Sequence, residues 1–334
     1  MPNRYFNQKH RLQSFHENVK SEGLMVVLAN SILMRSQPVS HEAGASHIVG
    51  ALMATVRKQG NRRKTGKEQY YTPPATASAI VSRLLSQMPF ARERAWIEPA
   101  GGTGSFIDAA RSLGVSTIIS YDIEPHHPDV KRGNFLKQKL KISGAVAVGN
   151  PPFGRNNALS VPFFNACAKH CDVICFIVPK SWRKWSVINR LDQSFHLVDD
   201  YDLQVNYDNV EGGELSEKFW LNTVVQTWER RGNPRGKISV EDRGVVRKAT
   251  PRSADVSLTI FGFSCGTLKT EFLRKPNTTQ IFLTLHHPRA LEALQNIDYS
   301  RFSQNTAYTA ALSLQEINYL LNEYLFGDSG LIVN

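Results

Sequence analysis

The tetrapeptide that most directly suggests chemistry in this chain consists of Asn150, Pro151, Pro152 and Phe153. An amine attached to an aromatic ring is a poor nucleophile because its lone pair is delocalised into the ring. The Asn150 side-chain oxygen and the Pro151 carbonyl oxygen could accept its two hydrogens and localise that pair on nitrogen. The prolines fix φ and preorganise the two acceptors, and Phe153 offers a face for stacking a base. The alternative is a proline-rich turn at the end of a strand.

A glycine-rich loop about fifty residues upstream predicts a nucleoside-cofactor site. Glycine lacks Cβ and tolerates positive φ, so the backbone can approach a ligand closely. An acidic residue at its start can take a cation or an amine. Neither G-x-G-x-x-G nor a P-loop lysine is present, which argues against a dinucleotide or ATP site. The residues expected to contact the cofactor here are Glu98, Pro99, Ala100, Gly102, Gly104 and Phe106.

Asp122 follows a second apolar run, about twenty residues after this loop. An acidic residue after the second strand of a nucleotide-binding α/β unit can bond a ribose diol. Ile123 could pack on the adenine of the cofactor. An exposed turn aspartate is the alternative.

The order of these motifs resembles S-adenosylmethionine-dependent amino-methyltransferases, especially adenine-N6 DNA methyltransferases. The resemblance covers roughly residues 67–230. It implies that an opening Tyr-Thr-Pro segment closes over the methionine end of S-adenosylmethionine, that Asn134 and Phe135 contact its adenine, and that Asn150 also touches it. The opening segment comprises Tyr71, Thr72 and Pro73.

Two positions depart from the usual pattern of that family. Asn134 stands where the family commonly has Asp, and Ala100 replaces a frequent serine. An asparagine carbonyl can still accept from an adenine amine, so we expect altered affinity. Alanine removes one hydroxyl near the cofactor.

The periodicity alternates strands and helices between residues 68 and 231, which predicts an α/β fold with a mostly parallel sheet. The resemblance makes this a Rossmann-like class I methyltransferase fold with a seven-stranded sheet and flanking helices. Strands are expected at 96–97, 117–121, 145–148, 173–178, 195–198 and 223–228, the last two as a possible antiparallel pair.

Three regions are expected along the chain. Residues 1–66 form a helical extension and a basic linker, and residues 67–233 form the catalytic domain. Residues 234–334 form a small α+β appendage, possibly for target recognition. It should contain a helix over 288–297 and another behind a capping box of Ser313 and Glu316.

Composition favours a soluble, cytoplasmic protein with a nucleic-acid partner. The 334 residues are 41% hydrophobic with a net charge of +11, which favours an anionic partner. No apolar run is long enough to span a bilayer, and the N-terminus lacks the apolar core of a signal peptide. No membrane contact is therefore expected, and the oligomeric state is not readable.

Several side chains are candidates for contact with the nucleic acid. The segment 181–185 interleaves aromatic residues and cations, which suits a sugar–phosphate backbone, although a half-buried surface loop is the alternative. Phe219 and Trp220 could supply a second stacking surface, with core packing the more frequent role for such residues. With Phe153, the candidates are Arg155, Trp182, Arg183, Lys184, Phe219 and Trp220.

No metal site is expected. The cysteines (Cys167, Cys171, Cys175 and Cys265) contain no CxxC pair and are interpreted as reduced, mostly buried thiols. His126, His127 and Asp129 lack a third spaced ligand and are interpreted as a polar turn.

The leading hypothesis is methyl transfer from S-adenosylmethionine to N6 of adenine in DNA. Because a base inside a duplex cannot reach such a pocket, the base would be flipped out. The same loop would serve an RNA adenine methyltransferase. A protein-glutamine methyltransferase is disfavoured by Phe153, where tyrosine is usual, and by the charge. A catalytically silent nucleic-acid-binding module is the remaining alternative. The target sequence and any restriction partner are not readable.

Overall fold

The computed structural model describes residues 70–205, 207 and 221–334. All of these residues belong to one compact unit, residues 63–334. The helical extension and basic linker predicted for residues 1–66 lie outside the described residues, and so do Phe219 and Trp220.

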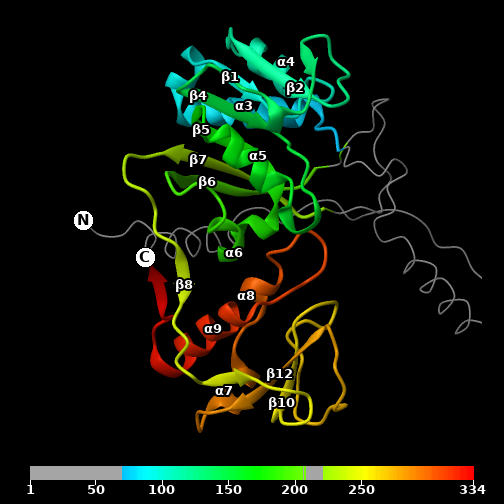
Figure 1. The fold of residues 1–334 in the computed structure, drawn as a ribbon, viewed down its shortest axis with the longest axis vertical. Helices are drawn as coiled ribbons and strands as arrows, with labels where there is room; N and C mark the ends of the chain where they lie inside the picture. The colour runs from blue at the N-terminus through cyan, green and yellow to red at the C-terminus, as the bar shows by residue number, and fades with distance from the viewer. Residues whose placement is uncertain (1–69, 206, 208–220) are drawn as a thin grey trace, which may run out of the picture. The chain divides into compact units, whose positions relative to one another are not determined.

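A seven-stranded sheet forms the upper part of the described structure in Figure 1. Its spatial order is β3-β2-β1-β4-β5-β7-β6, and only β7 runs antiparallel to its neighbours. This order confirms the predicted Rossmann-like class I methyltransferase fold. The strands are β1 (Trp96–Glu98), β2 (Ile118–Asp122), β3 (Val130–Arg132), β4 (Ala145–Gly149), β5 (Cys171–Pro179), β6 (Phe195–Leu203) and β7 (Thr223–Arg230).

Helices cover both faces of this sheet because its central strands are apolar on both sides. All five residues of β4 are buried. Val146 and Val148 belong to one core with the helices α3 (Pro74–Gln87) and α4 (Ser105–Ser112). Ala145 and Ala147 point to the other core, with α5 (Ser160–Cys167). The remaining short elements of this part are α6 (Trp185–Ile188), η1 (Pro89–Glu93), η2 (Phe135–Lys137), η3 (Arg155–Asn157) and η4 (Lys180–Arg183).

The strand order places a crevice at the carboxyl ends of β1 and β4. After β1 the chain moves to β2 on one side, and β4 returns to the other side of β1. In open α/β sheets such a reversal is where ligands bind. The glycine loop follows β1 and the Asn-Pro-Pro-Phe tetrapeptide follows β4, so both predicted motifs meet at this crevice.

The C-terminal elements form a four-stranded antiparallel sheet of order β11-β10-β12-β9, with helices packed on it around a third apolar core. A two-stranded pair, β8 with β13, completes this part. The elements are β8 (Ile238–Val240), β9 (Val246–Lys248), β10 (Val256–Thr259), β11 (Leu268–Lys269), β12 (Gln280–Leu285), β13 (Leu331–Val333), α7 (Ala290–Asn296), α8 (Ser300–Ser303) and α9 (Leu314–Phe326).

The predicted strands of the main sheet are present, and the last two do pair antiparallel. The predicted run at 195–198 continues to Leu203, and β3 was missed because two of its three residues are exposed. The capping box of Ser313 and Glu316 is confirmed at the start of α9. The boundary predicted at residues 233–234 falls between β7 and β8, and the division into two domains there stays a prediction.

Two features bear on the environment of the protein. No helix within the described ranges is long and apolar enough to cross a membrane. The four cysteines are free thiols; Cys167, Cys171 and Cys175 are buried, and Cys265 is partly exposed. Burial raises the pKa of the Cys175 thiol to about 12.

Candidate active site

A cavity of about 410 Å³ lies at the carboxyl ends of β1, β2 and β4. Residues from all five predicted motifs meet in it, although Tyr71 and Pro152 lie 81 positions apart in the chain. The predicted residues that line it are Tyr71, Thr72, Glu98, Pro99, Ala100, Gly102, Phe106, Asp122, Ile123, Asn134, Phe135, Asn150, Pro152 and Arg155. Of the residues predicted for the cofactor site and the tetrapeptide, four do not line the cavity: Pro73, Gly104, Pro151 and Phe153.

The glycine loop between β1 and α4 needs its glycines. Gly102 has φ +48°, and a Cβ there would lie 2.8 Å from the Tyr71 ring. Gly104 has φ +81° and is the N-cap residue of α4, where a Cβ would meet His127 at 2.4 Å. The left-handed backbone and the close ring both exclude larger residues. The loop therefore presents bare backbone to the cavity, as a nucleoside ligand requires.

Asp122 links two loops of the cavity by accepting a hydrogen bond from each. Its Oδ2 accepts a hydrogen bond from the Gly102 N–H at 2.9 Å, and its Oδ1 accepts one from the Glu124 N–H at 2.8 Å. A carboxylate oxygen has capacity for more than one bond, so a ribose diol could still donate to it. Asp122 thus combines the predicted ribose-binding position with a structural role that the sequence did not indicate.

Glu98 is a buried carboxyl group facing the cavity. Only 2% of its surface is exposed, and burial raises its pKa well above the usual value. The Ser120 hydroxyl donates to Oε2 at 3.4 Å, and no described cation pairs with the group. A positively charged ligand group entering the cavity would compensate its buried charge. The site therefore fits a cationic cofactor such as S-adenosylmethionine.

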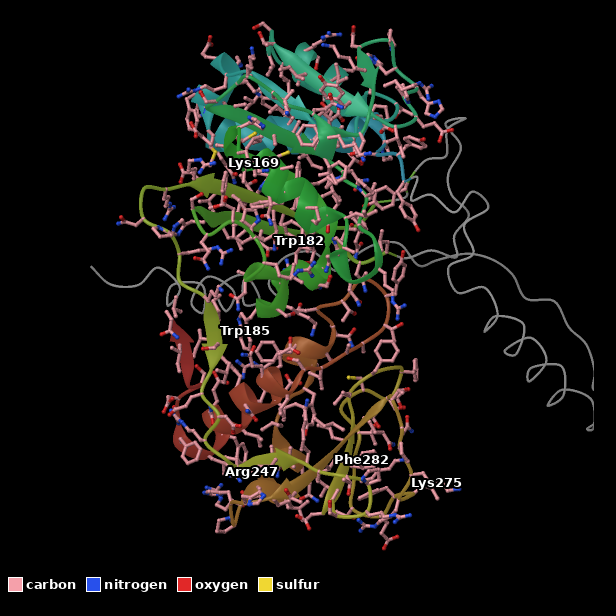
Figure 2. All side chains as sticks on the ribbon, in the orientation of Figure 1. Lys169, Trp182, Trp185, Arg247, Lys275 and Phe282 are labelled. Carbon is pink, nitrogen blue, oxygen red and sulfur yellow. The ribbon has the colours of Figure 1, made fainter. Side chains whose placement is uncertain are left out.

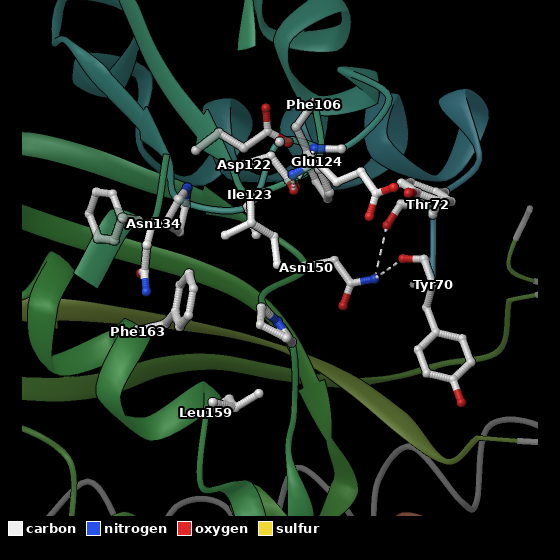
Figure 3. A pocket seen from close by; sticks show the side chains of 18 of the residues that line it. Tyr70, Thr72, Phe106, Asp122, Ile123, Glu124, Asn134, Asn150, Leu159 and Phe163 are labelled. Carbon is white, nitrogen blue, oxygen red and sulfur yellow. Dashed lines mark hydrogen bonds between the residues drawn. The ribbon is translucent and has the colours of Figure 1, made fainter. Parts of the chain in front are cut away.

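Asn150 presents an unpartnered oxygen at the cavity. Its Nδ2 donates to the Tyr70 carbonyl oxygen at 3.0 Å and to Thr72 Oγ1 at 3.3 Å. Because a carbonyl oxygen only accepts, this contact fixes which atom is the amide nitrogen. Oδ1 is buried and has no hydrogen-bond partner. In Figure 3 it lies on the side of the amide away from Tyr70 and Thr72.

The loop after Pro152 is anchored on neighbouring elements. Asn156 and Asn157 both have left-handed backbones, with φ of 54° and 60°. The Asn157 Nδ2 donates to Ser181 Oγ at 3.0 Å, and Arg190 donates to the Asn156 carbonyl oxygen at 3.0 Å. Asparagine is among the residues that adopt this backbone most readily. Contacts with the ends of two other elements therefore hold the loop in place.

The predicted stacking face of Phe153 is covered in this structure. Only 7% of the residue is exposed, and its ring packs in the core beneath α3. Its carbonyl oxygen accepts from the N–H groups of Leu159 and Ser160 and so closes the loop. Phe153 therefore anchors the tetrapeptide in the core and does not line the cavity.

The predicted nucleic-acid contact of Trp182 is wrong, because the ring is fully buried. The Trp182 ring packs edge-on against Phe164, with the ring centroids 5.7 Å apart, and its Nε1 donates to Ser160 Oγ at 3.2 Å. Figure 2 shows it against the helices of the sheet, whereas Trp185 lies toward the C-terminal elements. The rings of Trp185 and Phe302 pack together there, with their centroids 5.4 Å apart.

The cations of the same segment are already paired within the chain. Arg183 bonds Asp200 and Asp202 on the edge strand β6. Lys184 Nζ lies 2.8 Å from Glu316 Oε1 in α9. Phosphate contact by either residue would require breaking these pairs, so the structure corrects the expectation of a free basic stripe. The partners are distant in sequence, which is why composition alone suggested a free patch.

Arg155 differs from these two cations. It is exposed, lines the cavity and makes no ion pair with any described residue. Because it lines the same cavity as Asn150, it stays a candidate for nucleic-acid contact.

No group of three or more His, Cys, Asp or Glu residues that could hold a metal ion occurs within residues 70–205, 207 and 221–334. In the polar turn, Asp129 pairs with Arg111, and His127 Nε2 lies 3.3 Å from Asp108 Oδ1.

Some lining residues were missed by the sequence analysis. Tyr70, Glu124 and Phe163 also line the cavity. The Phe163 ring stacks on Phe135 with centroids 6.1 Å apart. Tyr70 directly precedes a predicted residue, whereas nothing local in the sequence distinguishes Phe163 from other apolar helix residues.

Two curated proteins match part of the chain: the type II methyltransferases M.HincII of Haemophilus influenzae and M.HindII of Haemophilus influenzae strain Rd. Each is 30% identical over 101 residues. The match covers 29% of this chain but only 19% of each relative. These matches confirm the resemblance to methyltransferases that the motifs indicated. No protein-family profile matches the chain.

Solved structures are similar only in outline. One is assigned as an RNA methyltransferase from Pyrococcus horikoshii, with a TM-score of 0.41 and 19% identity over 54% of this chain and 97% of that one. Another is a modification subunit assigned to a type I restriction enzyme from Vibrio vulnificus, with a TM-score of 0.36 and 13% identity over 80% and 59%. Both scores are low, and the fold class rests on the strand order given above.

Proposed function

We propose that this protein transfers a methyl group from S-adenosylmethionine to the N6 amine of adenine in DNA. The observation that carries the proposal is the buried, unpartnered Oδ1 of Asn150 at a cavity lined by a glycine loop, a ribose-type aspartate and a buried carboxyl group. A buried acceptor without a donor costs about 1–3 kcal/mol. An incoming amine N–H would remove that cost.

The cofactor would lie along the carboxyl ends of β1 and β2. Asp122 would accept from the ribose hydroxyls, Ile123 and Phe135 would flank the adenine, and Asn134 would accept from its amine. Glu98 and the segment around Tyr71 would enclose the methionine end. When bound, S-adenosylmethionine supplies an electrophilic methyl group. Binding and orientation are the work of these side chains.

The target amine would be held by the tetrapeptide. Asn150 Oδ1 accepts one N6 hydrogen, and the Pro151 carbonyl oxygen is proposed to accept the other. Their preorganisation matters because a fixed acceptor needs no reorganisation during the reaction. The orientation of Oδ1 is fixed by the two bonds that Nδ2 makes to Tyr70 and Thr72.

DNA is the proposed polymer, and a modification role beside a restriction activity is the proposed setting. The net charge of +11 favours a polyanion, and both curated relatives are named type II methyltransferases. The proposed reaction acts on one base at a time, so an adenine in a duplex would have to be flipped out of its stack. Residues 234–334 are proposed as the accessory region for target recognition.

Nucleoside mass spectrometry tests this proposal. The protein is incubated with S-adenosylmethionine and either mixed-sequence DNA or mixed-sequence RNA, and the polymer is digested to nucleosides. N6-methyladenine from DNA, absent with Asn150→Ala, is the expected result. The same product from RNA alone would replace DNA as the substrate. Methylation of a protein substrate with none in nucleic acid would overturn the proposal.

A further inference from the structure

An exposed aromatic turn follows β10 in the C-terminal part. This aromatic turn, residues 261–266, carries Phe263 with 109% and Phe261 with 49% of their surface exposed. The turn itself is well anchored. Cys265 N–H donates to the Gly262 carbonyl oxygen at 3.1 Å, and Gly266 N–H donates to Thr259 at 2.8 Å. A phenylalanine ring is thus held in solvent on a closed turn.

The aromatic turn is joined to the mouth of the candidate active site by one connecting segment, residues 306–312, which lies between α8 and α9. At one end of this segment, Gly262 N–H donates to the Ala310 carbonyl oxygen at 3.0 Å, and Phe261 bridges to Ala311. At the other end, the Ala307 carbonyl oxygen accepts from Asn222 at 2.9 Å, directly before β7.

A side-chain contact completes the connection. The hydroxyl of Tyr308, in the middle of the segment, lies 3.4 Å from the hydroxyl of Tyr70. Tyr70 lines the cavity, and its carbonyl oxygen holds the Asn150 amide. Tyr308 is itself 45% exposed. Exposed aromatic rings therefore continue from the cavity mouth to Phe263.

We propose that Phe263, together with Phe261 on the same turn and Tyr308 on the connecting segment, stacks on nucleic-acid bases next to the adenine that enters the cavity. Bases stack favourably on aromatic side chains without sequence preference, and inserted apolar side chains help to unstack neighbouring base steps. This inference rests on the proposed function, because it needs a nucleic acid at the cavity mouth. It assigns the stacking role to the C-terminal part, whereas the sequence had suggested Phe153, Phe219 and Trp220.

Leu273 provides a matched control on the same hairpin. It is 81% exposed, so it is also an apolar side chain in solvent. It follows β11, at the opposite end of the β10–β11 pair from the aromatic turn. The neighbouring Arg274 donates to the Ala254 carbonyl oxygen at 2.7 Å, just before β10 begins. Leu273 therefore shares the exposure of Phe263 but not its connection to the cavity.

The experiment measures binding of a fluorescein-labelled mixed-sequence DNA duplex, and of one of its strands, by fluorescence anisotropy in fixed salt. Phe263→Ala should weaken binding at least about fivefold, the lower end of one base–aromatic stack. Phe263→Trp should restore it, Phe263→Leu should not, and Leu273→Ala should bind like the unchanged protein. Calorimetric binding of S-adenosylmethionine should be the same for all.

Three results would overturn the inference. Phe263→Ala could bind DNA as tightly as the unchanged protein, or Leu273→Ala could weaken binding equally. Third, Phe263→Ala could change the sedimentation or the melting temperature of the protein and leave DNA binding unchanged. That result would show that another copy or another part of the chain covers the Phe263 ring. If the unchanged protein methylates DNA while Phe263→Ala binds normally, only this inference fails. If the unchanged protein neither binds nor methylates nucleic acid, the proposed function fails first.

Discussion

Lys184 Nζ lies 2.8 Å and 2.9 Å from the two carboxylate oxygens of Glu316, and this pair joins the segment between η4 and α6 to α9. Glu316 also closes the capping box of α9, since its Oε2 accepts from the Ser313 N–H at 2.8 Å. Both side chains are largely removed from solvent, with 14% and 3% exposed. One carboxylate thus starts a helix and neutralises a cation of a different part of the fold.

Removing Lys184 should destabilise the protein. Lys184→Ala leaves the Glu316 carboxylate buried without its partner, which costs on the order of 3–5 kcal/mol. Urea unfolding measures the loss. Lys180→Ala is the matched control, because its partner Asp202 is 57% exposed and such pairs contribute at most about 1 kcal/mol. Equal stability of both variants, with weakened DNA binding only for Lys184→Ala, would return Lys184 to the nucleic-acid surface.

The candidate site was largely predictable because its motifs are local. Glu98 ends β1, Asp122 ends β2 and Asn150 directly follows β4, and the carboxyl ends of neighbouring parallel strands lie at one edge of the sheet. Asp122 and Asn150 therefore reach the same cavity, although they belong to different strands. Strand type could be predicted for the same reason, since runs such as 145–148 are apolar throughout.

Segment 181–185 could not be predicted, because its partners are distant in sequence. Trp182 is buried by Ser160 and Phe164, and Lys184 is neutralised by Glu316. A run of tryptophans and cations reads the same whether it faces phosphate or a carboxylate on another element. The exposure of Phe263 had no sequence signal either, since apolar residues on short hairpins are usually buried.

Cofactor affinity should rise with pH because of Glu98. Burial raises the pKa of this carboxyl well above 4.5, so its contribution to folding stability is present at low pH and is lost as pH rises through the folded-state pKa. A cationic ligand favours the ionised carboxylate. S-adenosylmethionine should therefore bind more tightly above that pKa than below it.

Glu98→Gln isolates this effect. Calorimetric titration over a pH series should show weaker cofactor binding with the pH dependence largely removed. Without ligand, the variant should also lose less stability than the unchanged protein as pH rises. An unchanged pH profile of binding in Glu98→Gln would mean that the cofactor's positive charge does not meet this carboxyl.

The Gly102 position should reject a side chain for two separable reasons. Gly102→Ala places Cβ 2.8 Å from the Tyr71 ring and holds alanine at φ +48°, a strain of about 1–2 kcal/mol. We expect weaker cofactor binding and lower stability. Gly244→Ala is the control for the backbone alone, because Gly244 has φ +68° with nothing within 4 Å of a Cβ.

Removing the Tyr71 ring should relieve the steric clash with the Cβ of Gly102→Ala. The double variant Gly102→Ala, Tyr71→Ala should recover stability relative to the sum of the single changes, as measured in a double-mutant cycle. Strict additivity of the two changes would show that the glycine is required for its backbone only.

Asn150 should act through its oxygen, with its nitrogen serving only to orient it. Asn150→Ala should lower the single-turnover rate on the order of 10²-fold or more, as expected for losing a preorganised polar contact, while cofactor affinity is largely kept.

Asn150→Asp keeps an acceptor but loses the N–H groups that bond Tyr70 and Thr72, so it should also be slow. Thr72→Val removes only the weaker of the two orienting bonds and should cost about tenfold or less. Single-turnover methyl transfer and calorimetry separate rate from affinity. A Thr72→Val rate as low as that of Asn150→Ala would place the chemistry at Thr72, and a nearly unchanged Asn150→Ala rate would remove Asn150 from the reaction.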